Sequence, residues 1–283
     1  VKTRKPFDVE YEFEDPKNPG TYRWFLGRAV PAFDENGNIK QWIGTFTDIN
    51  EFKQLQKQKD NFLGIASHEL KTPLTSLKLY TQFIEKSLVI ANDLKNAKVA
   101  QKMDGQIDHL KALVDDLLDV TKIQNGKLQL NESYFDFDAL IEEVVVEQQM
   151  SSRHKIQVYK NNIGEIYADR HRLSQVMSNL ISNAIKYSPE ADEVHVSAWD
   201  EGGKILFKVR DFGIGIPEDK QDRVFEQYYR VSGTKEHTFP GLGLGLYISS
   251  EIIKRSGGKI YVHSFDGKGS DFCFEIPKAK NLK

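Results

Sequence analysis

A repeat of apolar residues between positions 63 and 88 constrains the fold of this 283-residue chain more than any other feature. At about 100° per residue, the repeat falls on one stripe of a single helix, which is typical of the buried seam of a helical bundle. The positions on the stripe are Leu63, Ala66, Leu70, Leu74, Leu77, Thr81, Ile84 and Leu88. The sequence therefore predicts a long amphipathic helix that ends near residues 88–91.

A second amphipathic helix follows a short polar connection at Asn92-Asp93 and ends at the stop signal Asn125-Gly126. Two such helices form an antiparallel hairpin, but they cannot bury broad apolar faces by themselves. We therefore expect two copies of the hairpin to form a four-helix bundle, so the chain should be a homodimer. The apolar side of the second helix comprises Met103, Ile107, Leu110, Val114, Leu117 and Thr121.

The side of the first helix away from the stripe carries His68, Glu69 and Thr72. A neutral imidazole is a nucleophile, and with an ordinary pKa of about 6.5 most of it is neutral at pH 7. A neighbouring carboxylate can orient the ring and accept its proton. The alternative interpretation is a solvated polar face. Pro73 lies inside the helical pattern, where it removes a backbone donor and is expected to bend the helix.

Composition excludes several classes of protein. The hydrophobic share of 39% and the charged share of 28% are those of a well-solvated protein with real cores, and the length suits about two domains. The net charge of −2 indicates no general attraction to nucleic acid or to an anionic membrane. The single cysteine, Cys273, cannot form an internal disulfide. Without a signal pattern or an apolar run of 18 residues, we expect a cytoplasmic chain without membrane contact of its own, and a longer receptor of which it is the cytoplasmic portion stays open.

Residues 1–50 are predicted to form β-structure. Alternating strands span 7–13, 21–32 and 39–47, and the segment Asp34–Asn38 is a hairpin turn. This strand–turn–strand pattern resembles the C-terminal half of a PAS sensor domain. A polar helix with a sparse apolar seam follows at 49–66, typical of a short parallel coiled coil, and it continues into the helix of His68.

Residues 127–283 alternate helices with strands, which indicates an α+β sandwich. Strands are predicted at 127–130, 156–159, 165–168, 194–200, 204–211, 259–263 and 270–276, and the sheet is expected to be antiparallel. Helices are predicted at 137–150, from the cap Asp169 to Tyr187, and after Gly243.

Three motifs in this region predict a nucleotide site. Asn179, Asn183 and Lys186 share one face of the helix after Asp169, where amide oxygens could bind Mg²⁺ and the amine could offset phosphate charge. The second motif is Asp211-Phe212-Gly213-Ile214-Gly215, in which the carboxylate suits the amine of adenine. The third is Gly241-Leu242-Gly243-Leu244-Gly245 at a helix start, which favours phosphate. A Rossmann fold is disfavoured because no strand leads directly into this last motif.

Together these features resemble the sensor histidine kinases. His68-Glu69-Leu70-Lys71-Thr72-Pro73-Leu74 resembles their phosphoacceptor box, and the later motifs, with Phe225 to Arg230 between them, resemble their N, G1, F and G2 boxes in order. Gly267-Lys268-Gly269-Ser270 is similar to the terminal glycine motif, and the segment 231–240 to the ATP lid. The resemblance implies a Bergerat-type ATP-binding domain, with ATP and Mg²⁺ as cofactors.

The same resemblance implies a role for each motif residue. His68 would be the phosphoacceptor and Glu69 its base, while Thr72 would help to place water for dephosphorylation of a partner. Asn183 would bind Mg²⁺ with support from Asn179, and Asp211 would recognise adenine. Phosphate or sugar would contact Lys186, Tyr187 and Arg230, and the pocket would be shaped by Gly213, Gly215, Gly241, Gly243, Leu244 and Gly245. The other histidines, including His109, are expected to be ordinary surface or structural residues.

The sequence therefore predicts a multidomain α+β chain with a PAS-like sheet at 1–50, a signalling helix and phosphotransfer hairpin at 51–126, and a catalytic domain at 127–283. Its expected function is ATP-dependent autophosphorylation of His68, followed by transfer to an aspartate of a response regulator. The alternatives are a phosphatase-biased regulator of the same class, an ATP-driven chaperone or repair ATPase with the same ATP-binding fold, and a PAS scaffold without activity. The phosphoacceptor box and the intact nucleotide motifs argue against the last two.

Overall fold

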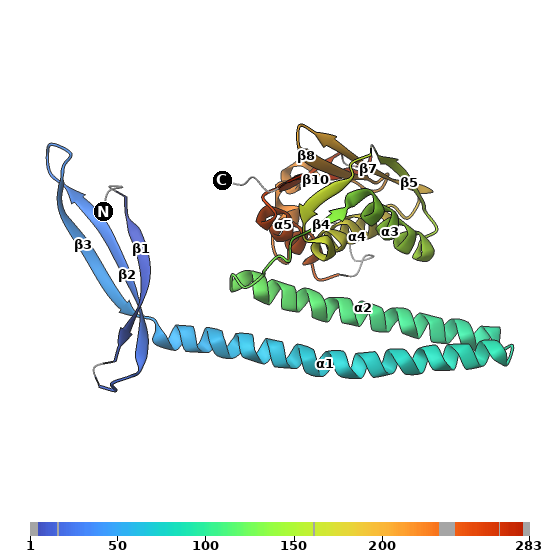
Figure 1. The fold of residues 1–283 in the computed structure, drawn as a ribbon, viewed down its shortest axis with the longest axis horizontal. Coiled ribbons are helices and arrows are strands. Elements are labelled where there is room, and N and C mark those ends of the chain that lie inside the picture. The colour runs from blue at the N-terminus through green and yellow to red at the C-terminus, as the bar shows by residue number, and fades with distance from the viewer. Residues whose placement is uncertain (1–4, 16, 161, 232–240, 266, 280–283) are drawn as a thin grey trace. The chain divides into compact units, whose positions relative to one another are not determined.

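The computed structural model describes residues 5–15, 17–160, 162–231, 241–265 and 267–279, except for the side chain of His68. The chain divides into two compact units, Val1–Pro73 and Leu74–Lys283. Most of their helices and strands are labelled in Figure 1. None of the helices in the described ranges has the length and apolar character needed to cross a membrane.

The first unit begins with a three-stranded antiparallel sheet in the order β1-β2-β3. Its strands are β1 (Phe7–Glu14), β2 (Tyr22–Phe33) and β3 (Ile39–Asp48). In the turn between β2 and β3, the Asp34 carboxylate accepts hydrogen bonds from the backbone N of Asn36 at 3.0 Å and of Asn38 at 2.8 Å. Gly37 takes a φ of 76°, which glycine adopts without steric cost. The predicted strands and turn are confirmed.

Helix α1 (Asn50–Ile90) starts directly after β3 and continues through Pro73. Its first turn is attached to the sheet, because Lys53 Nζ lies 2.6 Å from Glu10 Oε2 and 5.2 Å from the centroid of the Trp24 ring. The predicted continuity between the polar helix after residue 49 and the helix of His68 is confirmed.

In the second unit, the part of α1 after Pro73 lies antiparallel to α2 (Leu94–Gln124), as Figure 1 shows. The connection turns at Asn92, whose φ is 58°, and the Asp93 carboxylate caps α2 by accepting a hydrogen bond from Asn96 N at 3.2 Å. An ion pair between Lys78 and Asp108 joins the two helices.

Only part of the predicted apolar stripe is buried inside the hairpin. The buried positions on its two helices include Thr81, Ala97, Ala100 and Ile107. A second set of apolar side chains, spaced by seven residues on each helix, stays between 39% and 52% exposed: Leu77 and Ile84 on α1, and Met103, Leu110 and Leu117 on α2. One hairpin therefore leaves apolar surface on both helices that it cannot cover itself.

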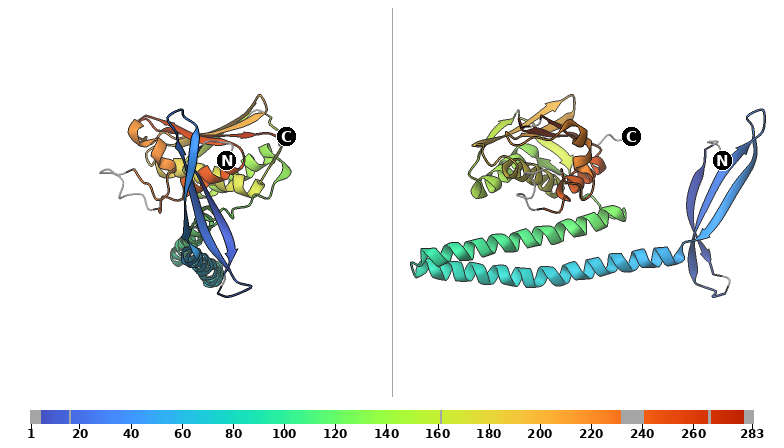
Figure 2. Two further views of the ribbon diagram at one scale, coloured as in Figure 1. Left: turned by 90° about the vertical axis from the view of Figure 1, so that its left-hand side faces the viewer. Right: turned by 180° about the vertical axis from the view of Figure 1, so that it is seen from behind.

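The α/β part of the second unit is built on a five-stranded sheet in the order β5-β7-β8-β10-β9. Figure 2 shows that its three helices lie on one face of this sheet. The helices are α3 (Phe137–Ser151), α4 (Arg170–Lys186) and α5 (Gly245–Arg255). The strands are β5 (Lys155–Lys160), β7 (Glu193–Glu201), β8 (Lys204–Arg210), β9 (Lys259–Ser264) and β10 (Ser270–Pro277).

The hydrophobic core lies between the helices and the sheet. It includes Phe137 of α3, Met177 of α4, and Phe207 and Phe274 of neighbouring strands, all of which are fully buried. Two 3-10 helices, η1 (Glu218–Lys220) and η2 (Asp222–Phe225), follow β8. The predicted α/β sandwich is confirmed.

The strand predicted at Lys127–Leu130 is wrong. After α2 ends, the backbone N of both Lys127 and Leu128 bonds to the carbonyl of Lys122, and the Leu128 carbonyl accepts a hydrogen bond from Arg255 Nη1 at 2.9 Å. The backbone partners of this segment are therefore a helix end and a side chain. The strand lies later, as β4 (Ser133–Asp136), which pairs antiparallel with β6 (Glu165–Ala168).

The expectation of a wholly antiparallel sheet is also wrong, because β5 pairs parallel with β7. The chain leaves β5, forms β6 and α4, and returns to the same sheet as β7. A helical crossover of this kind joins parallel neighbours. The other pairs within the five-stranded sheet are antiparallel, as predicted.

The last turns of α2 pack on the α/β domain. The Asp119 carboxylate accepts hydrogen bonds from Arg172 Nη1 at 2.5 Å and from Gln175 Nε2 at 2.9 Å, both on α4. Val120 and Ile123 are buried in the same hydrophobic cluster as the core of that domain. The end of the hairpin is therefore part of the folded domain that follows it.

We expect Asp119→Ala to lower the free energy of unfolding by about 3 kcal/mol, because it leaves the largely buried guanidinium of Arg172 without its carboxylate. Urea denaturation of the purified chain measures this change. The exposed Glu147→Ala on α3 is the control and should change stability by no more than about 0.5 kcal/mol. Equal stability of the two variants would show that the contact does not stabilise the fold.

Candidate functional site

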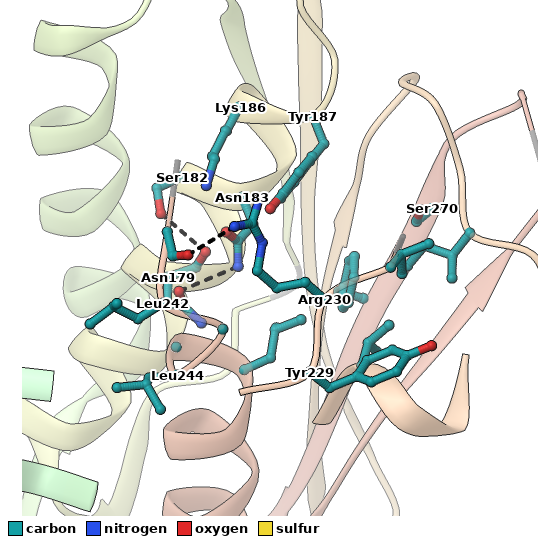
Figure 3. Close-up of a pocket in the computed structure, with 18 of the residues that line it drawn as sticks. Asn179, Ser182, Asn183, Lys186, Tyr187, Tyr229, Arg230, Leu242, Leu244 and Ser270 are labelled. Atoms are coloured by element: carbon teal, nitrogen blue, oxygen red, sulfur yellow. Dashed lines mark hydrogen bonds between the residues drawn. The ribbon is translucent and has the colours of Figure 1, made fainter. Parts of the chain in front are cut away.

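A pocket of about 570 Å³ opens between α4, the end of β8 and the segment before α5 (Figure 3). Nearly all of the residues predicted to contact or enclose the nucleotide line it. They are Asn179, Asn183, Lys186, Tyr187, Asp211, Gly215, Arg230, Gly241, Gly243, Leu244 and Gly245. The segment predicted to be the ATP lid lies at 232–240, outside the described residues.

Helix α4 forms one wall of the pocket. Asp169 caps its start by accepting a hydrogen bond from Arg172 N at 3.0 Å, and the apolar side of the helix is fully buried. That burial fixes the rotation of the helix, so that Asn179, Asn183 and Lys186 come to the pocket side. Asn183 Nδ2 donates to Asn179 Oδ1 at 3.3 Å.

Two cations mark one side of the pocket. Figure 3 shows the side chains of Lys186 and Arg230 directed to the same region as Asn183. Burial, and then the nearby charge of Arg230, lower the pKa of Lys186. Arg230 Nη1 donates to the Gly241 carbonyl at 3.3 Å, which ties it to the glycine-rich segment. Two positive groups held together in a partly desolvated place favour a polyanion.

Asp211 provides a carboxylate at the buried end of the pocket and is only 3% exposed. Burial raises the pKa of this carboxyl, against hydrogen bonds from the backbone of Gly213 and from Ser270. Gly213 N donates to Asp211 Oδ1 at 2.9 Å. A carboxylate fixed in this way can accept a hydrogen bond from an amine on a bound ligand.

The glycines of the second motif have different roles. Gly215 lines the pocket with a φ of 71°. Gly213 is not among the lining residues, and a Cβ at this position would lie 2.0 Å from the Tyr187 carbonyl oxygen. Gly213 therefore permits the end of β8 to pack against the end of α4.

The glycine-rich segment before α5 crosses over the strained residue Tyr228, whose φ is 60°. Tyr228 N donates to the Gly243 carbonyl at 3.1 Å, and a Cβ on Gly243 would lie 2.9 Å from the Tyr229 carbonyl oxygen. Helix α5 begins beside the pocket, and no side-chain cap is present at its start in the described part of the chain. The first N–H groups of a helix have no partner inside the helix, so they suit a bound anion.

Some residues of the site could not be identified from sequence motifs. The exposed His109 and the half-buried Asp116 of α2 line the pocket. Their contribution depends on the packing of α2 on the α/β domain, which no local pattern shows. Ser249 of α5 lies behind the pocket wall, where its Oγ accepts a hydrogen bond from Asn179 Nδ2. Tyr229 and Ser270 also line the pocket, and they belong to the segments 225–230 and 267–270 that resemble kinase motifs.

The remaining predicted site residues lie in the first unit. His68 is helical within α1, and Glu69 and Thr72 are exposed on the same helix. The side chain of His68 lies outside the described part of the chain. In the ranges that the structure describes, no group of three or more His, Cys, Asp or Glu side chains could hold a metal ion.

We expect Gly213→Ala to weaken nucleotide binding and to destabilise the domain, because the new methyl group would overlap the Tyr187 carbonyl. Fluorescence titration with a labelled nucleotide and thermal unfolding measure the two effects. Gly105→Ala on α2 is the control, since its Cβ would meet no atom within 4 Å, and helix propensity predicts a gain of about 1 kcal/mol. Unchanged affinity and stability of Gly213→Ala would contradict the assigned role.

The raised pKa of the Asp116 carboxyl leads us to expect that the stability of the fold depends on pH. Burial, followed by the charges of Asp119 and Asp115, raises its pKa from 3.8 to about 6. The folded chain keeps this proton when the unfolded chain has lost it, so wild-type stability should fall as the pH rises from about 4 to about 6. Asp116→Asn should therefore be more stable than wild type above pH 6, and the difference should disappear near pH 4. A difference that is constant from pH 4 to pH 8 would contradict the raised pKa.

Two family models match the chain. Residues 58–126 match the His Kinase A (phospho-acceptor) domain, and residues 168–280 match the histidine kinase-, DNA gyrase B-, and HSP90-like ATPases. The second model by itself would also admit a chaperone or a repair ATPase. The first model separates this chain from those proteins.

Individual relatives agree with the family models. Sensor protein kinase WalK of Staphylococcus aureus is 30% identical over 247 residues, which are 86% of this chain and 59% of that protein. In WalK of S. aureus strain JH9, the match covers 40% of the relative, so the chain spans about half the length of these proteins.

Two solved structures of histidine kinases are also similar. Full-length ShkA in complex with AMPPNP is 28% identical with a TM-score of 0.56, over 79% of this chain and 47% of ShkA. Acinetobacter baumannii AdeS is 27% identical with a TM-score of 0.51, over 75% of this chain and 98% of AdeS. With a phosphoacceptor domain followed by an ATPase-type domain that encloses the pocket, the chain belongs to the sensor histidine kinase family.

Proposed function

We propose that this chain uses Mg-ATP to phosphorylate His68 and then transfers the phosphoryl group to an aspartate of a response regulator. The observation that carries the proposal is the pocket, in which the amide pair, the cation pair and the buried carboxylate line one cavity. The chain that holds this pocket also carries the phosphoacceptor sequence His68 to Leu74 on a helix.

ATP suits the chemistry of the pocket from one end to the other. The Asp211 carboxylate accepts a hydrogen bond from the amine of adenine, between apolar side chains such as Ile214 and Phe272. Lys186 and Arg230 offset the charge of the phosphates, and the start of α5 adds open N–H groups. The similar kinase ShkA was solved with the ATP analogue AMPPNP, which supports this assignment.

The donor set also fits Mg²⁺. Because Asn183 directs its Nδ2 to Asn179, its amide oxygen is the group available to a ligand in the pocket. Mg²⁺ takes oxygen ligands, keeps several waters, and in ATP sites is held largely by the phosphates. One amide oxygen of Asn183 is then a sufficient protein ligand. The bound ion would neutralise charge on the phosphates during transfer.

The proposed reaction is an in-line phosphoryl transfer. A ring nitrogen of neutral His68 attacks the γ-phosphorus, a nitrogen–phosphorus bond forms, and the bond to the ADP oxygen breaks. Glu69 accepts the proton that leaves the imidazole. In the second step the phosphoryl group passes to the aspartate of the regulator, and Thr72 helps to place water when the regulator is dephosphorylated.

We also propose a domain organisation with a PAS-like sensor sheet at 1–50, a signalling helix and phosphotransfer hairpin at 51–126, and the catalytic domain at 127–283. The exposed apolar side chains on the hairpin, such as Leu77 and Leu110, suit a homodimer in which two hairpins form one bundle. Since α1 runs from the sheet into the phosphoacceptor region, movement of the sheet would change the presentation of His68.

Incubation with Mg²⁺ and γ-labelled ATP tests the proposed activity. The wild type should gain acid-labile, base-stable label, and His68→Ala should gain none because it lacks the nucleophile. His263→Ala is the matched control, since His263 is exposed on β9, and it should label like wild type. Label that persists in His68→Ala would identify a different acceptor and overturn the assignment.

A further inference from the structure

Helix α5 supports the pocket wall on α4 from behind. Asn179 Nδ2 of α4 donates to Ser249 Oγ of α5 at 3.0 Å, and Ser249 is only 2% exposed. On the other side of the same amide, the Asn179 oxygen lies so close to Gly245 that a Cβ there would be 2.4 Å away. Ser249 and Gly245 are one helical turn apart, so one face of α5 contacts both the nitrogen and the oxygen of this amide.

The orientation of Asn179 in turn determines that of Asn183. An asparagine side chain has one oxygen acceptor and one nitrogen donor group, so the position of one fixes the other. Because Ser249 takes the Asn179 nitrogen, the Asn179 oxygen is left to accept from Asn183 Nδ2 at 3.3 Å. The Asn183 nitrogen therefore bonds to Asn179, and the Asn183 oxygen is the part of the amide that can bind a ligand in the pocket.

We infer that Ser249 is a positioning residue for the divalent cation of the nucleotide. It acts through Asn179 to hold the amide oxygen of Asn183 ready for the ion, although Ser249 itself does not line the pocket. This inference rests on the proposed function. Its specific content is that a hydroxyl on α5, outside the pocket, controls metal affinity through two amides.

The two hydrogen bonds that link Ser249, Asn179 and Asn183 form a relay, and the structure indicates why this relay would affect metal binding more than nucleotide binding. The adenine end of the pocket is built by Asp211 and the phosphate end by Lys186 and Arg230, and no hydrogen bond of the relay includes any of these residues. Loss of the Ser249 hydroxyl would free the Asn179 amide to rotate, and Asn183 would lose its fixed partner. Outer partners of metal ligands typically contribute 10- to 100-fold to metal affinity.

The test measures metal and nucleotide binding separately in the full chain. Mn²⁺ is titrated in the presence of saturating ADP and followed by its electron paramagnetic resonance signal, and ADP binding without divalent cation is measured by calorimetry. For Ser249→Ala we expect Mn²⁺ affinity to fall about tenfold, while metal-free ADP affinity changes less than about twofold. Ser249→Thr keeps the hydroxyl and should restore most of the Mn²⁺ affinity.

A matched control and a second variant address folding. Ser256→Ala removes a hydroxyl from the end of the same helix, where it donates to the Ile252 carbonyl, and should change neither affinity. Asn179→Ala should weaken Mn²⁺ binding at least as much as Ser249→Ala does. Adding Ser249→Ala to Asn179→Ala should then have no further effect, since Ser249 acts through Asn179.

The outcomes separate the inference from the proposed function. If the wild type binds neither ADP nor Mn²⁺ with ADP, the proposed function is wrong. If the wild type binds both, and Ser249→Ala leaves both affinities unchanged or lowers them equally, the positioning role is wrong while the function stands. Additive losses in the double variant would likewise contradict a relay through Asn179.

Discussion

Helix α4 packs its apolar side into the core and presents a polar edge to the pocket, and much of the second unit depends on this arrangement. Its apolar side is fully buried against α3, α5 and the sheet, with Leu173, Met177 and Leu180 among its completely inaccessible residues. That burial leaves a polar edge that cannot rotate away from the pocket. Arg172 holds the end of α2 on this edge, while Asn179 and Asn183 face the cavity. One helix therefore joins the hairpin, the core and the proposed nucleotide site.

The hairpin, unlike α4, leaves apolar residues exposed, because its two helices have more apolar surface than they can bury against each other. Thr81 and Ile107 are buried between the helices, whereas Leu77, Leu110 and Leu117 remain exposed. The seven-residue spacing of these exposed positions is the spacing that packs helices in bundles. Association of two hairpins would cover them, so the proposed homodimer follows from the burial of apolar area rather than from any polar contact.

Most elements of the fold could be predicted from sequence, because each has a strong local signal. The cap Asp169, the connection at Asn92-Asp93, the turn at Gly37 and the stop at Gly126 all lie where the sequence places them. The predictions of secondary structure and strand direction were wrong where tertiary contacts determine the backbone conformation or the strand pairing. Lys127–Leu130 is irregular because side chains and a helix end satisfy its backbone, and β5 is parallel to β7 because α4 forms the crossover between them.

In the candidate site, too, residues with a local sequence signal could be predicted, and residues brought in by tertiary packing could not. The motif residues Asn183, Asp211 and Gly243 line the pocket, since they belong to contiguous patterns that fold locally. The places of His109 and Asp116 on the pocket, and of Ser249 behind it, could not be predicted, because packing of other helices brings these residues there. Gly213, which was expected to shape the pocket, lies against the Tyr187 carbonyl rather than in the lining, and no sequence pattern shows this packing contact.

The central claim is that the pocket on α4 delivers a phosphoryl group to a histidine rather than to water. Phosphorus NMR of the intact chain during incubation with Mg-ATP tests this most directly, because it shows where the γ-phosphorus goes. The account predicts a protein-bound resonance of a nitrogen–phosphorus bond that grows as ATP is converted to ADP. Stoichiometric release of inorganic phosphate without any protein-bound intermediate would contradict the account and indicate a simple ATPase.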